Sequence, residues 1–171
     1  MKLASFEAIV RVLNNADARY LVVGGLAVAA HGYGRVTFDI DLVLQLQTEN
    51  VHNAMNALES LGYKPFVPVA AGDFADPVIR QTWIQEKNMV VFQLYSDHHP
   101  ETRIDLFVTE PFDFDKEYSN ALVEELIPGH LVRFVRIETL IRMKELAGRE
   151  KDMEDIRQLK ILMNHMDNHG R

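Results

Sequence analysis

The sequence contains no cysteine, carries little positive charge and has no long apolar run. The missing thiols exclude disulfides, thiolate metal sites and cysteine nucleophiles, and they are typical of a reducing compartment. The net charge of -7 excludes the strongly basic overall surface of many nucleic-acid-binding domains. A membrane span needs about 20 consecutive apolar residues, and none is present. We therefore expect a cytoplasmic protein without membrane contact.

The composition is that of a globular protein with a substantial core, because 47% of the residues are hydrophobic and 25% are charged. We expect residues 1–171 to form a single domain, with a core at about 18–136 and a helical pair at about 137–165. The acidic excess lies in residues 1–129, whereas residues 130–171 carry a small basic excess. A polyanion would therefore meet the C-terminal part or arrive with metal ions.

Hydrophobic spacing predicts both helices and strands. Helices are expected at 4–16, 24–32, 48–62, 76–87, 137–147 and 151–164, and strands at 20–23, 38–46, 88–96 and 103–109, with a hairpin around Pro128-Gly129. Strands follow one another without a helix between 88 and 137. This order predicts an α+β fold with a mixed central β-sheet flanked by helices, in place of a doubly wound parallel sheet.

Two aspartates stand at the entrance of an apolar stretch in "FDIDLVLQL". Asp39 and Asp41 are two residues apart, so on a strand they point to the same side. A solvated face of a half-buried strand is the simplest interpretation. However, the unbroken apolar run at 40–44 is typical of a strand that is covered on both faces. Two like charges at such a place repel each other unless a cation lies between them.

A third aspartate has a comparable setting in "RIDLFV". A lone Asp105 in so apolar a strand needs a partner such as Arg103, a position at the strand edge, or a metal ion. Each aspartate taken alone has a structural explanation. If Asp39, Asp41 and Asp105 converge, their oxygens form a site that suits Mg²⁺ or Mn²⁺.

Gly24 and Gly25 form a turn between the strand at 20–23 and the helix that follows. Backbone amides at the start of that helix would offer a binding site for an anion. Because glycine has no side chain, a phosphate could approach these amides closely. A Gly-Gly pair by itself usually marks only a tight turn. Its place before Asp39 and Asp41 gives a phosphate cradle followed by metal carboxylates, which is a layout that holds a metal-bound triphosphate.

With these residues the chain resembles the nucleotidyltransferase superfamily, which has the DNA-polymerase-β-like fold. The superfamily motif is a GG or GS turn, then D-x-D or D-x-E on the next strand, then a carboxylate on a later strand. The segments "GGLAVAAHGYGRVTFDIDLVL" and "LIRMKELAGREKDMEDI" look most like the small bacterial AbiEii/AbiGii toxin-type branch. The likeness runs from about residue 20 to 160.

The resemblance implies transfer of a nucleoside monophosphate from a nucleoside triphosphate (NTP) to a hydroxyl. Two Mg²⁺ or Mn²⁺ ions would bridge Asp39, Asp41, Asp105 and the phosphates, one activating the acceptor hydroxyl and the other stabilising pyrophosphate. Asp105 would assist deprotonation of the hydroxyl. The acceptor would be RNA such as a tRNA end, a protein or a small molecule, and a toxin would have an antitoxin as partner.

The sequence departs from the superfamily pattern at the glycine turn. Many members have a serine after the first glycine, whereas here Gly25 is followed by Leu26. Contact with the phosphates would then fall to backbone amides, including those of the Gly24-Gly25 turn, and to Arg35 or Thr37. Arg35 is equally well explained as a surface residue beside a glycine-containing loop.

The last two predicted helices carry charges on their apolar faces. Lys144 lies beside Ile137 and Ile141, and Asp152 and Asp155 lie on the apolar arc of the second helix. A buried structural ion pair is one interpretation, and an outward-pointing lysine is another. The resemblance favours a phosphate-facing Lys144 steadied by a carboxylate, so we assign Lys144 and Asp155 to nucleotide binding.

Two other classes of function are consistent with parts of the pattern. The first is a catalytically inactive module of the same fold that binds a nucleotide or a partner, which the absent serine favours. Three retained strand aspartates speak against it. The second is a hydrolase that uses the same carboxylates, but no nucleophile motif such as G-x-S-x-G is present.

Overall fold

The computed structural model describes residues 1–169. The α-helices are α1 (Leu3–Asn15), α2 (Gly24–Ala30), α3 (Thr48–Ser60), α4 (Pro77–Lys87), α5 (Phe114–Ser119), α6 (Ile137–Ala147) and α7 (Glu150–His169), with a 3₁₀ helix η1 at Ala71–Ala75. The strands are β1 (Tyr20–Val22), β2 (Asp39–Leu44), β3 (Lys64–Pro65), β4 (Val91–Tyr95), β5 (Arg103–Phe107), β6 (Leu122–Ile127) and β7 (His130–Phe134). None of the described helices is long and apolar enough to cross a membrane.

The seven strands form one sheet in the order β3-β4-β5-β2-β1-β7-β6. The pairs β2·β5 and β1·β7 are parallel, and the other four neighbouring pairs are antiparallel. The predicted α+β fold with a mixed sheet and a C-terminal helical pair is therefore confirmed. The short strand β1 and the glycine turn lead through α2 directly into β2, which lies beside β1 at the centre of the sheet.

The prediction that no helix lies between 88 and 137 is wrong, because α5 occupies Phe114–Ser119. Asp113 caps this helix, and its carboxylate accepts a hydrogen bond of 3.0 Å from the backbone N–H of Lys116. The helix has only six residues, which is too few for a hydrophobic period to appear in the sequence. The sheet stays mixed because α5 does not change how its strands pair.

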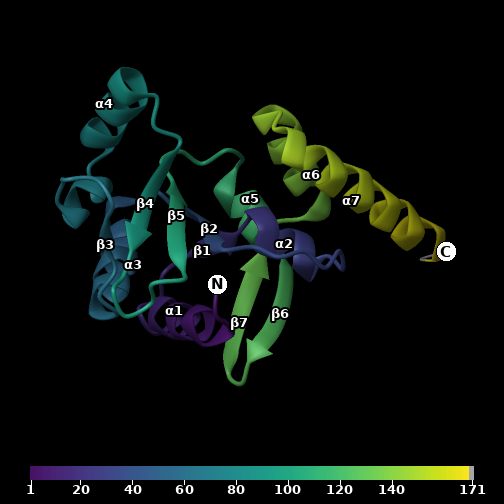
Figure 1. The fold of residues 1–171 in the computed structure, drawn as a ribbon, viewed down its shortest axis with the longest axis horizontal. Coiled ribbons are helices and arrows are strands. Elements are labelled where there is room, and N and C mark those ends of the chain that lie inside the picture. The colour runs from purple at the N-terminus through teal and green to yellow at the C-terminus, as the bar shows by residue number, and fades with distance from the viewer. Residues whose placement is uncertain (170–171) are drawn as a thin grey trace.

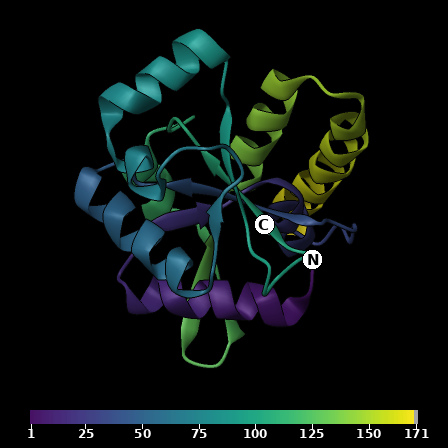
Figure 2. The same cartoon turned by 60° about the vertical axis from the view of Figure 1, so that its left-hand side comes forward.

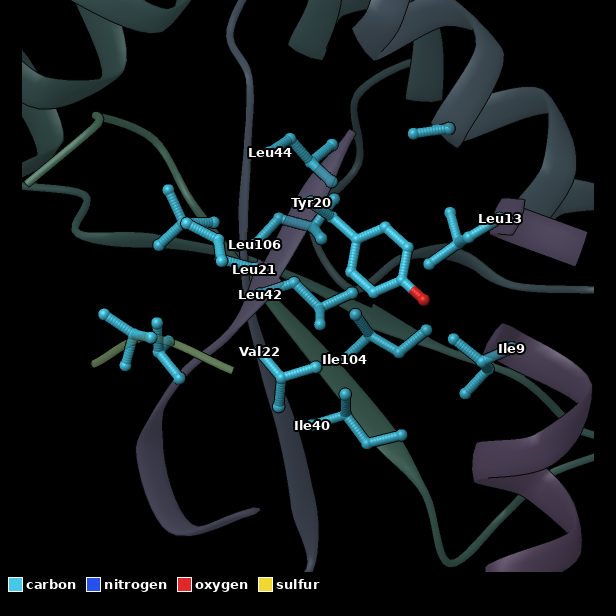
Figure 3. Close-up of a cluster of buried hydrophobic side chains, with 14 of the residues drawn as sticks. Ile9, Leu13, Tyr20, Leu21, Val22, Ile40, Leu42, Leu44, Ile104 and Leu106 are labelled. Atoms are coloured by element: carbon cyan, nitrogen blue, oxygen red, sulfur yellow. The ribbon is translucent and has the colours of Figure 1, made fainter. Parts of the chain in front are cut away.

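One face of the sheet is covered by α1, α3 and the segment around η1 and α4. Ile9 and Leu13 of α1 point toward Ile40, Ile104 and the ring of Tyr20 (Figure 3). Further along the same face, the Phe92 ring stacks on the rings of Phe74 and Trp83, with centroid distances of 5.0 and 5.1 Å. Burial of these aliphatic and aromatic side chains supplies the main stabilisation of the sheet.

The other face of β2, β5 and β4 is more open. Figures 1 and 2 show α6 and α7 as a pair on the opposite side of the molecule from α3 and α4. The side chains that alternate with the buried ones point to this face, and they include Asp39, Asp41 and Asp105. The fold therefore places the three aspartates on one surface.

The buried face generates a prediction about stability. Leu94 of β4 is fully buried in the core, so Leu94→Ala should lower the free energy of unfolding by about 2–5 kcal/mol through lost burial and a residual cavity. Leu146 of α6 is 85% exposed, and Leu146→Ala should change it by less than about 0.5 kcal/mol. Urea denaturation of both variants at pH 7 measures the difference. Equal effects would contradict the assignment of the core face.

Candidate active site

The three aspartates lie on two neighbouring parallel strands. Asp41 of β2 stands opposite Asp105 of β5 in the strand register, and Asp39 stands opposite Arg103. Ile40 and the equivalent residues of β5 point to the buried face, so all three aspartates share the open face. The structure thus brings together the carboxylates that the sequence singled out.

Neighbouring negative charges raise the pKa values of Asp41 and Asp105. Burial, followed by the negative charges of Asp105 and Asp39, raises the pKa of Asp41 from 3.8 to about 6. Arg149 and a hydrogen bond from the backbone N–H of Gly25 act in the opposite direction. Burial also raises the pKa of Asp105, with a further increase from Asp39, although Asp105 accepts a 2.9 Å hydrogen bond from Gln93 Nε2 that lowers it.

The donor set suits a hard divalent cation, although the site is not a closed cage of ligands. No group of three or more His, Asp or Glu side chains among the described residues is already arranged to hold a metal ion. The chemistry nevertheless fits, because carboxylate oxygens are the ligands that Mg²⁺ and Mn²⁺ prefer. A cation beside Asp41 and Asp105 would also remove the repulsion that raises their pKa values. Asp39, Asp41 and Asp105 are the residues that would hold such ions.

The glycine turn is pressed against the side chains of the site. Gly24 has a φ of +63°, and a Cβ atom there would overlap the Asp41 carboxylate. A Cβ atom on Gly25 would lie 2.8 Å from Oγ1 of Thr37. The N–H of Gly25 is directed at Asp41. Both positions require glycine because the side chains of Asp41 and Thr37 pack closely against them. The Gly25 amide, which was expected to face a phosphate, donates its hydrogen bond to Asp41.

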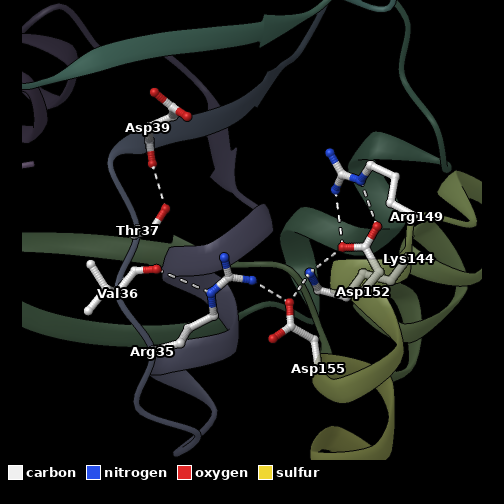
Figure 4. Close-up of polar contacts among 8 residues, drawn as sticks. All are labelled: Arg35, Val36, Thr37, Asp39, Lys144, Arg149, Asp152 and Asp155. Carbon is white, nitrogen blue, oxygen red and sulfur yellow. Dashed lines mark hydrogen bonds and ion pairs between the residues drawn. The ribbon is translucent and has the colours of Figure 1, made fainter.

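Five charged side chains link the loop before β2 to the C-terminal helices, and Figure 4 shows the contacts among them. They are Arg35, Lys144, Arg149, Asp152 and Asp155. Lys144 is buried and donates to Asp155 Oδ2 at 2.8 Å and to Asp152 Oδ1 at 3.3 Å. Arg35 donates to the same oxygen of Asp155. Arg149 donates to both oxygens of Asp152, at 2.6 and 3.1 Å. We call this set the charge ladder.

The charge ladder contains three of the residues that the sequence assigned to nucleotide binding, namely Arg35, Lys144 and Asp155. Lys144 is in a buried ion pair, and Asp155 is the carboxylate that holds it in place. Arg35 is tied to Asp155 and lies beside the glycine turn, since its guanidinium carbon would be 3.5 Å from a Cβ atom on Gly25. Thr37 donates to the backbone carbonyl of Asp39 at 3.2 Å. Direct contact of these residues with a nucleotide stays a prediction.

A cavity of about 650 Å³ lies between the open face and α6. Its polar side chains are those of Asp41, Asp105, Thr109, Lys144 and Arg149, and Gly24 lies beside them. The remaining wall is apolar and includes Val90, Val91, Phe107, Leu140, Met143 and Leu146. The cavity therefore places two carboxylates opposite two cations, with apolar surface beside them.

Three polar residues of this region were not predicted as site residues. Gln93 orients Asp105, Arg149 lines the cavity, and Asp152 holds both Arg149 and Lys144. Gln93 is the one polar residue in the apolar run 90–94, which was a usable signal. Arg149 and Asp152 are three residues apart at a helix start, a spacing that favours an ion pair.

The mixed sheet, the glycine turn and the facing carboxylates define the class of protein as nucleotidyltransferase-like. Comparison with protein families gives the group within that class. The model for nucleotidyltransferases of unknown function, DUF6036, matches residues 2–168, and the chain belongs to this family. No curated protein matches the chain.

Two solved structures of ANT(2″)-Ia are similar in fold. The crystal structure in complex with adenylyl-2″-tobramycin has a TM-score of 0.56 at 15% sequence identity, and the match covers 98% of each chain. The solution structure of the antibiotic-resistance factor ANT(2″)-Ia has the same TM-score and identity, covering 96% of this chain and 90% of that chain. At this identity the likeness shows the fold, and it confirms the predicted nucleotidyltransferase-like architecture.

The raised pKa of Asp41 predicts how stability depends on pH. Between about pH 4 and pH 6 the folded state binds more protons than the unfolded state, so the free energy of unfolding falls as the pH rises through this window. Asp41→Asn removes this cost and should be more stable than the wild type at pH 7.5, by up to about 3 kcal/mol. The difference should shrink toward zero near pH 4.

Urea denaturation at both pH values measures this effect. Glu59→Gln, at an exposed position of α3, is the control for loss of one negative charge. A destabilised Asp41→Asn variant at pH 7.5 would contradict the assignment of repulsion at this position.

Proposed function

We propose that the chain is a metal-dependent nucleotidyltransferase that transfers a nucleoside monophosphate from an NTP to a hydroxyl acceptor. The observation that carries the proposal is the facing of Asp41 and Asp105 in the wall of a cavity that Lys144 and Arg149 also line. Membership of a nucleotidyltransferase family supports it. Divalent ions, when bound, would supply charge neutralisation for the phosphates and activation of the hydroxyl.

The chain's own residues would divide the work. Lys144 and Arg149 present positive charge to the triphosphate, and the buried aspartates of the charge ladder keep both side chains in position. Gln93 fixes one oxygen of Asp105 and leaves the other free to accept the proton of the hydroxyl. Phosphoryl transfer of this kind rests mainly on positioning and on charge neutralisation.

The proposal extends to the acceptor and to the biological role. RNA, a protein and a small molecule are the candidate classes, and the adenylyl-2″-tobramycin named with ANT(2″)-Ia is an example of the third. A toxin paired with an antitoxin is a further prediction that rests on the sequence resemblance alone. The competing proposal is an inactive nucleotide-binding module, which the occupied Gly25 amide favours.

Labelled NTPs test the reaction. The wild-type protein, Mg²⁺ and a cell extract should transfer radiolabel from an α-labelled NTP to an acceptor, and EDTA should abolish the transfer. Asp39→Asn and Asp41→Asn should each lower the rate at least 100-fold, because each removes a negative ligand from the ions. Circular dichroism checks that both variants stay folded. Retained transfer in these variants would refute the mechanism, and NTP binding without any transfer would favour the inactive module.

Lys144 can be tested apart from the chemistry. Lys144→Met removes the charge at similar length, and we expect the Kd for Mg²⁺–NTP to rise about tenfold. Arg35 and Arg149 still hold Asp155 and Asp152, so the variant should fold. Lys160→Met, at an exposed ion pair with Glu145, is the matched control. An unchanged Kd in Lys144→Met, measured by calorimetry, would leave Lys144 a purely structural role.

A further inference from the structure

The open face of the sheet continues beyond the aspartates toward β3. Arg103 precedes Asp105 by two residues on β5, and Tyr95 follows Gln93 by two residues on β4. Side chains two apart on a strand share a face and are separated by about 6.7 Å. Phe66 extends the same surface, because its N–H donates to the carbonyl of Gln93 at 2.9 Å. We call Phe66, Tyr95 and Arg103 the aromatic patch.

The aromatic patch combines the exposed ring of Phe66 and the half-buried ring of Tyr95 with the guanidinium of Arg103. The Phe66 and Tyr95 rings meet edge to face, with centroids 6.0 Å apart, and Phe66 is 60% exposed. The Arg103 guanidinium lies 5.8 Å from the centre of the Phe66 ring and makes no ion pair within the described part of the chain. The neighbouring Lys64, by contrast, is paired with Asp97 at 2.8 Å.

The aromatic patch borders a second hollow of about 160 Å³. This hollow and the 650 Å³ cavity have no lining residue in common. They lie toward opposite ends of β5, because Phe107 lines the larger one and Arg103 lines the smaller one. Asp105, which lines the larger cavity, lies between Arg103 and Phe107 along β5. In Figure 1 the patch strands β3, β4 and β5 lie on the side away from α7.

From this arrangement we propose that the aromatic patch is the acceptor subsite and that the acceptor is a nucleotide, either free or at the end of a strand. The inference rests on the proposed function. A planar base stacks on exposed aromatic rings and on an arginine face, and its phosphate pairs with the same arginine. The triphosphate of the donor belongs in the larger cavity, where Lys144 and Arg149 lie, so donor and acceptor meet at Asp105 from opposite sides.

The reaction then balances as a simple transfer. The acceptor hydroxyl oxygen forms a bond to the α-phosphorus of the NTP, and the bond from that phosphorus to the β-phosphate oxygen breaks. Pyrophosphate leaves, and the hydroxyl proton passes to Asp105. Arg103 attracts an anionic acceptor and would repel a polycationic one, and Asp97, the carboxylate that lines the hollow, is already paired with Lys64.

Binding measurements test the subsite without requiring turnover. A fluorescein-labelled four-nucleotide RNA with a free 3′-hydroxyl should bind the full-length protein in the absence of NTP. Phe66→Ala and Arg103→Gln should each raise its Kd about tenfold. Arg103→Gln should also lower the slope of log Kd against log salt by about one. The Kd for Mg²⁺–NTP should stay unchanged in both variants.

Matched controls are available in the chain. Phe38→Ala removes another exposed phenylalanine, and Arg11→Gln removes an exposed arginine of α1. Neither should change RNA binding. Competition with a nucleoside monophosphate shows whether the acceptor is a free nucleotide or the end of a strand. Full competition indicates a free nucleotide, and weak competition indicates a strand end. Either result supports the subsite. Equal RNA affinity in the wild type, Phe66→Ala and Arg103→Gln would overturn it, whereas loss of Mg²⁺–NTP binding in the wild type would overturn the proposed function instead.

Discussion

The candidate active site is organised around two carboxylates of like charge on adjacent strands at the centre of the sheet. Asp41 and Asp105 stand in register, and burial raises the pKa of both, with further increases from Asp105 and Asp39 at Asp41 and from Asp39 at Asp105. Gly24 admits the Asp41 carboxylate, and Gln93 holds that of Asp105. This arrangement makes folding less favourable than two well-packed apolar residues at the same positions would. The cost is understandable when the carboxylates share a cation.

The charge ladder connects this centre to the C-terminal helices. It contains three cations and two buried aspartates, so one positive charge is left over on the side that faces Asp41 and Asp105. Arg149 is the member that partly offsets the charge of Asp41. Removing a single member would leave a buried charge with fewer partners, so we expect the stability contributions of the five side chains to depend on one another. Helix position and site electrostatics are therefore coupled through the same five side chains.

Features that follow from the local period of a strand or helix could be predicted from the sequence. Alternation along a strand placed Asp39 and Asp41 on one face, and helical spacing placed Lys144 among apolar residues. Features that depend on distant segments could not be predicted from local patterns, and the convergence of Asp105 with Asp39 and Asp41 was expected only from the family resemblance. The parallel pairing that puts Asp105 opposite Asp41 joins strands far apart in the chain, and the contact from Arg35 to Asp155 spans 120 residues. The glycine pair was recognised, but its closeness to Asp41 and Thr37 depends on packing that no local pattern encodes.

The direction of the strands gives the site its polarity. Because β2 and β5 run parallel, each step along them moves from the aromatic patch, past the aspartates, to the cavity beside α6. Arg103 lies at one end, level with Asp39 of β2, and Lys144 and Arg149 lie at the other end, with Asp41 and Asp105 between them. On the proposed function, two anionic substrates could each neutralise one end while their reacting groups meet at the centre. The positive side chains at both ends favour anionic over polycationic substrates, and Asp39 beside Arg103 offsets part of the charge at the patch end.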